Sequence, residues 1–181
     1  MYYVFLADGF EETEAIAPLD IIRRAEIEVY TVGVGAKVVT SAHNVPVVAD
    51  VIDCEICPDK DCEGIILPGG MPGSTNLDNS GVVDYMVKRA VLEDKYICAI
   101  CAAPFILGKR GILKGKRATC YPGFENQLEG AKLVNEGCVR DGKIITGRAM
   151  GSSHDFALEI IEVLRGKDER KRLSDAVLYF K

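Results

Sequence analysis

The segment YICAICAAP, residues 96–104, decides the fold class. Its first five residues, Tyr96 to Ile100, form an apolar run of the kind that a strand buried on both faces requires. The run stops at Cys101, and Pro104 stands where proline suits the first turn of a helix. A buried strand that turns abruptly into a helix is the repeating unit of a parallel α/β sheet.

The same order of strand, loop and helix precedes this segment. Residues 63–67 end in a short apolar run, the glycine-rich loop Pro68 to Gly73 follows, and apolar residues then recur at helical spacing from Val82 to Leu92. We therefore expect a second strand that leads through a tight loop into a second helix.

The amino-terminal segment gives a third such unit. The apolar run Tyr2 to Ala7 ends at Asp8, and a helical pattern covers Glu11 to Ala25. Pro18 lies inside this pattern, and we expect it to kink the helix or to mark its true start.

The remaining elements complete an alternating pattern over a single domain, residues 1–181, with a parallel sheet and helices on both faces. A minor edge segment is expected around Pro46, since proline cannot donate to a ladder. The further elements expected are strands at Ile27–Val32, Arg117–Cys120 and Val139–Thr146, and a last helix at Ser152–Leu164 with Arg165–Arg172 as its solvated end.

Composition narrows the class of protein. Of 181 residues, 48% are hydrophobic and 27% charged, which excludes a disordered chain. The net charge of −5 provides no field that would attract nucleic acid or an anionic membrane. No apolar stretch reaches the ~18 residues that span a bilayer. The first residues lack a basic secretory segment, so the seven cysteines are expected to be free thiols in a reducing cytoplasm.

Cys101 is the strongest candidate for chemistry, because reactive groups of open α/β sheets lie beyond the carboxyl ends of the strands. A thiol at an abrupt turn from strand to helix has the position of a nucleophile elbow, and the following helix is expected to lower its pKa. The backbone N–H groups of Gly70 and Ala102 are expected to form an oxyanion site. Position alone also allows the alternative that Cys101 is simply a small buried hydrophobe.

Glu14 is the candidate acid and base. Three glutamates follow the first strand, and Glu11 and Glu12 are explained as partners of the helix dipole. A carboxyl beside a thiolate cannot easily ionise as well, so Glu14 and Cys101 are expected to share one proton. Such a carboxyl can act as a general acid and base.

Metal binding and peptidase chemistry are the alternatives that other residues raise. Cys54 and Cys57 form one C-x-x-C pair and Cys98 and Cys101 a second, but 40 residues separate the pairs, far more than the roughly 15–20 of a zinc ribbon. Residues three apart in a strand also point to opposite faces, so we expect no metal site.

A peptidase would need a histidine beside the thiol. The chain has two histidines, His43 and His154, and neither is expected to adjoin a loop of the site, although His154 opens the last predicted helix. This placement argues against peptidase chemistry.

Four motifs carry a family resemblance. They are GFEETE (9–14), LPGG (67–70), AICAAP (99–104) and GSSHDFAL (151–158), in that order. With them the chain resembles the ThiJ/PfpI superfamily over nearly its whole length, most closely the branch of the parkinsonism-associated protein deglycase and its bacterial relatives. The resemblance implies a flavodoxin-like three-layer α/β sandwich with a mostly parallel sheet, related to class I glutamine amidotransferases, and a homodimer.

The resemblance also assigns roles to residues. Cys101 matches the reactive nucleophile, and Glu14 matches the protonated carboxyl bonded to it. Gly70 and Ala102 match the oxyanion donors, and Arg24 matches an arginine that supports the site from the helix after Glu14. Peptidase members carry histidine where this chain has Ala102, which argues against proteolysis.

The implied activity is that of a cysteine-dependent enzyme acting on small reactive dicarbonyls, of the glutathione-independent glyoxalase or deglycase type, without cofactor or metal. The alternative is a redox sensor or chaperone whose cysteine oxidises to a sulfinic acid. One departure concerns Tyr121, which stands where the deglycase carries a histidine. A phenol with a pKa near ~10 is a poor proton shuttle at neutral pH, so any glyoxalase activity is expected to rest on Glu14 and Cys101.

Overall fold

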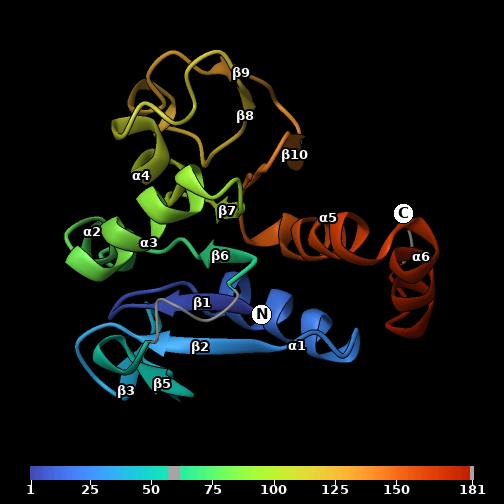
Figure 1. Ribbon diagram of the computed structural model, residues 1–181, viewed down its shortest axis with the longest axis horizontal. Coiled ribbons are helices and arrows are strands. Elements are labelled where there is room, and N and C mark those ends of the chain that lie inside the picture. Colours follow the sequence, from blue (N-terminus) through green and yellow to red (C-terminus); the bar gives the residue numbers. More distant parts are fainter. Residues whose placement is uncertain (57–61, 180–181) are drawn as a thin grey trace.

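The computed structural model describes residues 1–56 and 62–179 and has an α/β sandwich fold built on a seven-stranded sheet (Figure 1). The strands of this sheet are β1 (Tyr2–Leu6), β2 (Val29–Gly33), β5 (Val51–Ile52), β6 (Gly64–Leu67), β7 (Tyr96–Ile100), β10 (Cys138–Asp141) and β11 (Ile144–Gly147). Their order is β10-β11-β7-β6-β1-β2-β5, and every neighbouring pair is parallel except β10 with β11. The predicted flavodoxin-like architecture with a mostly parallel sheet is confirmed.

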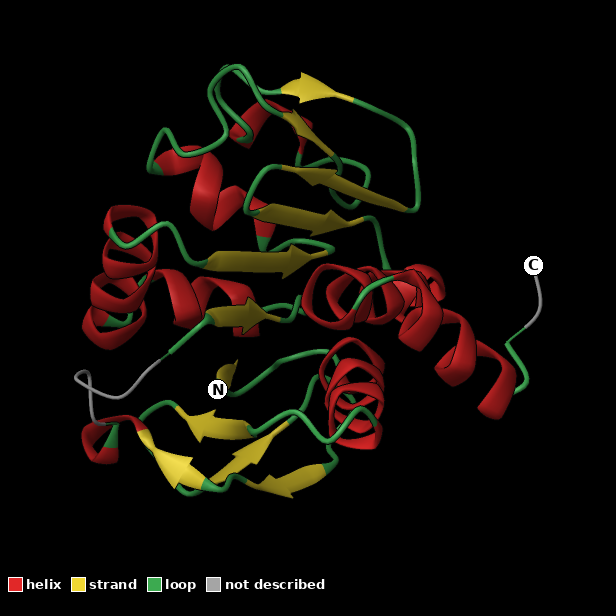
Figure 2. Ribbon diagram, turned by 45° about the vertical axis from the view of Figure 1, so that its right-hand side comes forward, coloured by secondary structure: helices red, strands yellow, loops and turns green. Residues whose placement is uncertain are grey.

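Helices cover both faces of the sheet, as the two flanking groups in Figure 2 show. The apolar side chains of the two groups belong to separate clusters, one on each face. One group is α1 (Glu12–Arg24), α5 (Ser153–Arg165) and α6 (Lys167–Ala176); the other is α2 (Gly73–Asp78), α3 (Gly81–Leu92) and α4 (Pro104–Lys109).

Strand β7 is apolar throughout because helices cover both of its faces. Ile97 and Ala99 pack into the cluster under α3 and α4, whereas Cys98 and Ile100 pack into the cluster under α1 and α5. Successive side chains of a strand point to opposite faces, so a strand covered on both sides needs apolar residues at every position. Burying an isoleucine side chain such as Ile97 or Ile100 stabilises the fold by about 1.5–3 kcal/mol.

Helix α1 begins at its acidic cap and not at Pro18. The Glu11 carboxylate accepts a hydrogen bond of 2.7 Å from the Glu14 N–H, which satisfies one of the free donors of the first turn. Pro18 lies buried inside the helix. It removes only the one bond that its missing N–H would have made.

Two predicted elements are wrong because glycines interrupt them. The single strand expected at residues 139–146 is a hairpin of β10 and β11, whose two-residue loop starts at Gly142 with φ 62°. The expected solvated end after Leu164 is a separate helix, α6, which begins beyond Gly166 with φ 87°. Leu173 of α6 is 1% exposed and belongs to the apolar cluster under α1 and α5.

Two small pairs of strands lie outside the main sheet. The segment with Pro46 forms β4 (Pro46–Val48), which pairs with β3 (Val38–Thr40), as expected of a minor segment. The strand expected at residues 117–120 is only β8 (Arg117–Ala118), and it pairs with β9 (Lys132–Leu133). Among the described residues, no helix has the length and apolar character needed to cross a bilayer.

Candidate active site

The loops after β1, β6 and β7 meet at the carboxyl edge of the sheet. The Glu11 N–H donates to the Gly69 carbonyl at 2.9 Å, and the Gly73 N–H donates to the Gly9 carbonyl at 3.2 Å. These bonds join the first loop to the glycine-rich loop. Since β1, β6 and β7 are neighbouring parallel strands, their carboxyl ends bring Glu14 and Cys101 to one place.

Cys101 has the backbone conformation of a nucleophile elbow. Its φ is 65°, a left-handed value that is uncommon for a residue with a Cβ and that marks local strain. Two hydrogen bonds hold it: its N–H donates to the Gly147 carbonyl at 3.0 Å, and its carbonyl accepts from the Tyr121 N–H at 2.8 Å. The side chain is half-buried. This geometry suits a nucleophile, and the catalytic role itself stays a prediction.

Glu14 is fully buried beside this thiol. Its Oε2 accepts a hydrogen bond of 3.0 Å from the Gly69 N–H. Its Oε1 is buried and makes no hydrogen bond with a nitrogen or oxygen of the described chain. The remaining partner of the carboxyl is the Cys101 thiol, with which it forms a hydrogen bond. The structure therefore pairs the two residues that the sequence singled out.

Gly69 makes this pairing possible, a role that the sequence did not reveal. A Cβ at this position would overlap with Glu14 Oε2 and would lie 2.5 Å from the Cβ of Cys101. The absent side chain of Gly69 thus leaves the space that the acid and the thiol occupy. The doublet Gly69-Gly70 after a buried strand was the available signal, because such a glycine often marks a close approach of other groups.

Burial determines how the Glu14 and Cys101 pair titrates. Burial raises the pKa of Glu14 to about 7. Burial, together with a charged Glu14, raises the pKa of the Cys101 thiol to about 12, against the opposing effect of two N–H groups directed at the sulfur. The predicted lowering of the thiol pKa by the next helix is therefore wrong, because burial outweighs the N–H groups at the sulfur. Two anions cannot share this buried space, so the pair holds one proton near neutral pH.

Gly70 and Ala102 supply the two N–H groups that point at the Cys101 sulfur. Gly70 adopts φ 88°, and a Cβ there would overlap with backbone atoms of the first loop. Donors already directed at a sulfur anion are placed to stabilise an oxyanion that forms beside it. The structure thus brings together four of the predicted site residues.

Arg24 does not join them within this chain. It is the last residue of α1, ten residues beyond Glu14, which corresponds to about 15 Å along a helix. Its Nε donates to Asp20 at 2.7 Å on the helix surface, and about half of the side chain is exposed. Tyr121 lies close through its backbone bond to Cys101, while its side chain is 47% exposed.

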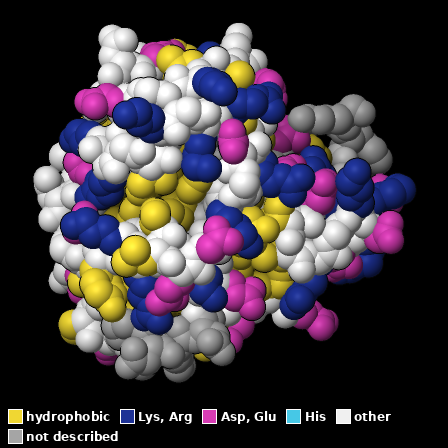
Figure 3. Space-filling view, turned by 45° about the horizontal axis from the view of Figure 1, so that its top comes forward, with side chains coloured by type: hydrophobic (Ala, Val, Ile, Leu, Met, Phe, Trp, Pro, Cys, Tyr) yellow, Lys and Arg dark blue, Asp and Glu magenta, His cyan; other side chains and the backbone are white. Residues whose placement is uncertain are grey.

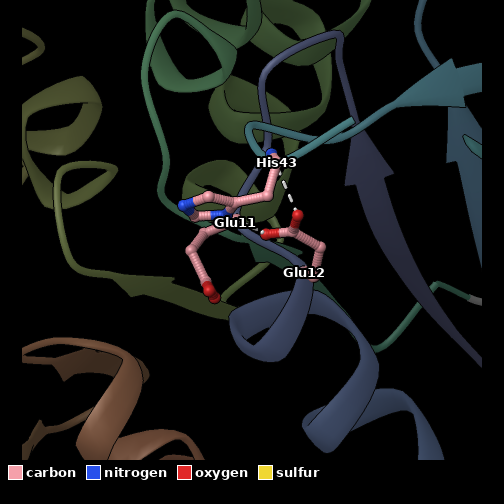
Figure 4. A group of neighbouring side chains, drawn as sticks. All are labelled: Glu11, Glu12 and His43. Carbon is pink, nitrogen blue, oxygen red and sulfur yellow. Dashed lines mark hydrogen bonds and ion pairs between the residues drawn. The ribbon is translucent and has the colours of Figure 1, made fainter. Parts of the chain in front are cut away.

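His43 adjoins the first loop of the site, contrary to the prediction (Figure 4). Its Nδ1 lies 2.9 Å from Glu12 Oε2, and its backbone N–H donates to Glu12 Oε1 at 3.0 Å. The loop after β3 folds over the start of α1, a contact between distant segments that no local pattern reveals. Partial burial would raise the pKa of Glu12, but hydrogen bonds from His43 and Ser41 lower it to about 2.

Side-chain oxygens of Glu11 and Glu12 and a ring nitrogen of His43 lie within 4.8 Å of one another, so these residues form a possible cation site. In Figure 4 the Glu11 carboxyl points away from the other two side chains. Each carboxylate already accepts hydrogen bonds, Glu11 from the Glu14 N–H and Glu12 from Ser41 and His43. These hydrogen bonds hold the loop together, and they explain why the three side chains lie close without requiring a cation.

The remaining histidine and cysteines lie as follows. His154 stacks on Tyr179 with the ring centroids 5.3 Å apart. Among the described residues, no group of three potential metal ligands includes a cysteine. Cys98 is buried within β7, and Cys57, half of the other C-x-x-C pair, lies outside the described residues.

Comparison with known proteins decides the family. The sequence profile of the DJ-1/PfpI family matches residues 2–163. The chain belongs to the DJ-1/PfpI family. This confirms the resemblance to the ThiJ/PfpI superfamily and its branch.

Named relatives span nearly the full chain. Protein dj-1beta of Drosophila melanogaster is 35% identical over 178 residues, which cover 97% of this chain and 95% of the relative. A glutathione-independent glyoxalase of Caenorhabditis elegans is 31% identical over 165 residues, with 90% of this chain and 87% of the relative covered.

Solved structures of this family share the fold. The crystal structure of Drosophila melanogaster DJ-1beta has a TM-score of 0.94 and 34% identity, and covers 99% of this chain and 98% of its own. A DJ-1 superfamily protein from Salmonella typhimurium has a TM-score of 0.93 and 36% identity, with the same coverage.

Proposed function

We propose that this DJ-1/PfpI chain is a cysteine-dependent enzyme that acts on small reactive dicarbonyls without glutathione, as a glyoxalase or a deglycase. The observation that carries this proposal is the buried pair of Glu14 and Cys101, with two N–H groups directed at the sulfur. The pair offers a nucleophile, a proton carrier and oxyanion donors within one loop cluster. The name of the Caenorhabditis elegans relative, a glutathione-independent glyoxalase, supports the same reaction class.

The reactive form of the pair has its proton on Glu14 and Cys101 as a thiolate, which the N–H groups of Gly70 and Ala102 stabilise against the burial that favours the thiol. The sulfur adds to the aldehyde carbon, a C–S bond forms, and the carbonyl electron pair moves to the oxygen. The N–H groups of Gly70 and Ala102 stabilise that oxyanion until it takes up the proton. The product of this step is a hemithioacetal.

Glu14 then moves a proton between adjacent carbons. Its carboxylate takes the proton from the carbon bonded to sulfur, which gives an enediolate, and returns that proton to the neighbouring carbon, while the hydroxyl proton passes from the first oxygen to the second. The result is a thioester of a 2-hydroxy acid on Cys101. Water breaks the C–S bond, and methylglyoxal leaves as lactate with the thiol restored. A pKa of about 7 suits Glu14 to both transfers, because it accepts and donates with similar ease near neutral pH.

Turnover of methylglyoxal to lactate by the purified protein tests this proposal. Cys101→Ser and Glu14→Gln are expected to reduce kcat/KM by at least about 100-fold, in the range that nucleophilic and general acid–base groups contribute. Cys54→Ser is the matched control, because Cys54 is an exposed free thiol on another segment and its loss is expected to leave turnover unchanged. Equal turnover in all four proteins would refute the enzyme proposal.

Sulfur oxidation is a second candidate function. The same two N–H groups that face the Cys101 sulfur would hold the oxygens of a sulfinate. A solved relative is described as Toxoplasma gondii DJ-1, oxidized. Mass spectrometry after peroxide treatment is expected to find two added oxygens on Cys101 before the exposed Cys54. Preferential oxidation of Cys54 would contradict a sensor role.

We also propose that the chain forms a homodimer in a reducing cytoplasm, as the family resemblance implies. Ile16, 40% exposed on α1 close to the site, offers an apolar contact for a second copy. Light scattering of the purified protein is expected to give twice the chain mass of 19.7 kDa. A mass of one chain at micromolar concentration would contradict the dimer.

A further inference from the structure

On the face seen in Figure 3, hydrophobic side chains gather in hollows that Lys and Arg side chains border. A groove at the amino edge of the sheet encloses about 690 Å³. We call it the amino-edge groove. The end of α3, the start of β7, the segment after α4 and the turn between β10 and β11 frame it. Its apolar lining comprises Val91, Tyr96, Ile97, Ile112 and Ile144.

The apolar lining is continuous from the core to the rim. Ile97 and Ile144, which are 1% and 5% exposed, are paired neighbours in β7 and β11 and form the floor. Val91 is 49% exposed at the rim, and Ile112 is partly buried beside it. Apolar surface left open at a concave site favours a ligand with an apolar body.

Three lysines line the same groove, Lys95, Lys116 and Lys143. The stem of a lysine can lie along an apolar lining while its ammonium group reaches solvent. One acidic side chain, Asp94, lines the groove with them. The groove is therefore basic in a chain whose net charge is −5. Charge of this sign beside an apolar hollow favours an anion.

The ammonium groups of these lysines have hydrogen-bond donors available for an anionic ligand. Lys143 Nζ stands 4.2 Å from the centroid of the Tyr96 ring, a contact that leaves its donors open. Lys116 Nζ forms a long ion pair of 3.9 Å with Asp141, a distance beyond hydrogen-bond range. Within residues 1–56 and 62–179, no carboxylate forms an ion pair with Lys95.

We propose that the amino-edge groove binds a small amphiphilic anion, a molecule with an apolar body and a carboxylate or phosphate at one end. The apolar body would lie on Ile97, Ile112 and Ile144, and the anionic group would meet the lysines at the rim. The volume of the groove falls within the ~300–1,000 Å³ that small-molecule sites have.

This groove is separate from the candidate active site. Tyr96 starts β7 at the groove and Cys101 follows its end, so the length of the strand, about 16 Å at ~3.3 Å per residue, lies between them. The two sites occupy opposite edges of one sheet. Binding at the groove therefore does not depend on the proposed reaction of Cys101.

Calorimetric titration with octanoate, octyl phosphate and octanol tests the proposal. Both anions are expected to bind, octanol is expected to bind at least tenfold more weakly, and the stronger of the two anions identifies the headgroup class. In the paired variant Lys95→Gln/Lys143→Gln, anion affinity is expected to fall at least tenfold. Lys167→Gln, an exposed lysine of α6, is the matched control and is expected to bind like the parent.

Backbone amide NMR locates the ligand. Gly111 and Gly142 line the groove, and their amide signals are expected to shift with octanoate in proportion to binding. Ile112→Asp, which places a negative charge in the lining, is expected to abolish the shifts while thermal unfolding reports whether the variant folds. The proposal would be overturned if octanol and octanoate bound with equal affinity, or if the paired lysine variant bound the anions as tightly as the parent. It would also be overturned if octanoate shifted only amide signals outside the groove.

Discussion

The carboxyl of Glu14 and the thiol of Cys101 meet beside Gly69, where a Cβ would overlap with both residues, and Glu14 is fully buried. The two residues come from different strand ends and meet because β6 separates β1 from β7 by a single strand. A buried carboxyl with one oxygen bonded to a single N–H is poorly compensated as an anion. The pair therefore favours a shared proton, and this proton governs both stability and reactivity.

The first prediction concerns Glu14 and the pH dependence of stability. Its pKa is raised from 4.5 to about 7 in the folded protein, so the folded state binds this proton more tightly than the unfolded state. The stabilisation is complete below pH 4.5 and is lost as pH rises to about 7, by about 3 kcal/mol in the free energy of unfolding. Glu14→Gln is expected to remove this fall. Urea unfolding across the pH range measures it.

A surface variant controls for general effects of charge. Glu129→Gln replaces an exposed glutamate and is expected to retain the fall in unfolding free energy between pH 4.5 and about 7. If Glu14→Gln loses stability over that range as steeply as the parent protein, Glu14 is not the buried acid that the structure shows.

The second prediction concerns Gly69. An added Cβ would overlap with the Glu14 carboxyl and the Cys101 Cβ, so acid and thiol must move apart. Gly69→Ala is expected to destabilise the protein by about 1–3 kcal/mol, the usual cost of overpacking, and to reduce methylglyoxal turnover at least about 100-fold. Gly81→Ala is the control, because nothing lies within 4 Å of a Cβ at that position. Full turnover in Gly69→Ala would show that the pair is not essential.

The sequence predicted those parts of the fold and site that depend on local pattern. Apolar runs and helical spacing predicted β1, β6, β7 and the helices that follow them. Because reactive groups of open α/β sheets lie beyond the carboxyl ends of the strands, Glu14 and Cys101 were then expected at that edge of the sheet. Arg24, by contrast, was assigned from motif position alone and lies on the helix surface beside Asp20.

Features that depend on contacts between distant segments were not predictable. The contact of His43 with Glu12 requires the loop after β3 to fold over α1. The raised pKa of Cys101 depends on how deeply the pair is buried, which no spacing reveals. The strand breaks at Gly142 and the helix breaks at Gly166, and both glycines are visible in the sequence. A glycine ends a strand or helix there because its backbone adopts a positive φ, and the sequence alone does not show the φ angle.

The third prediction concerns the interaction of His43 with Glu12. A hydrogen bond and the charge of Glu12 raise the pKa of His43 above its usual value. Glu12→Gln is expected to lower the pKa of His43, because the imidazolium loses its partner. NMR titration of the ring protons measures this directly, since the chain has only two histidines. The His154 signal, which arises from the ring stacked on Tyr179, is the internal control. An unchanged His43 titration would contradict the contact.

The last prediction concerns Tyr121, which stands where the deglycase of the resembled branch carries a histidine. Its backbone N–H donates to the Cys101 carbonyl at 2.8 Å, so the residue is fixed beside the nucleophile loop. An imidazole with a pKa near ~6.5 exchanges protons at neutral pH far more readily than a phenol with a pKa near ~10. Tyr121→His is expected to raise kcat for methylglyoxal by about tenfold or more, since a positioned acid–base group contributes roughly 10²–10⁴. Tyr121→Phe is expected to match the parent protein in steady-state assays. If the histidine and phenylalanine variants turn over at the same rate, proton transfer in this site runs through Glu14 alone.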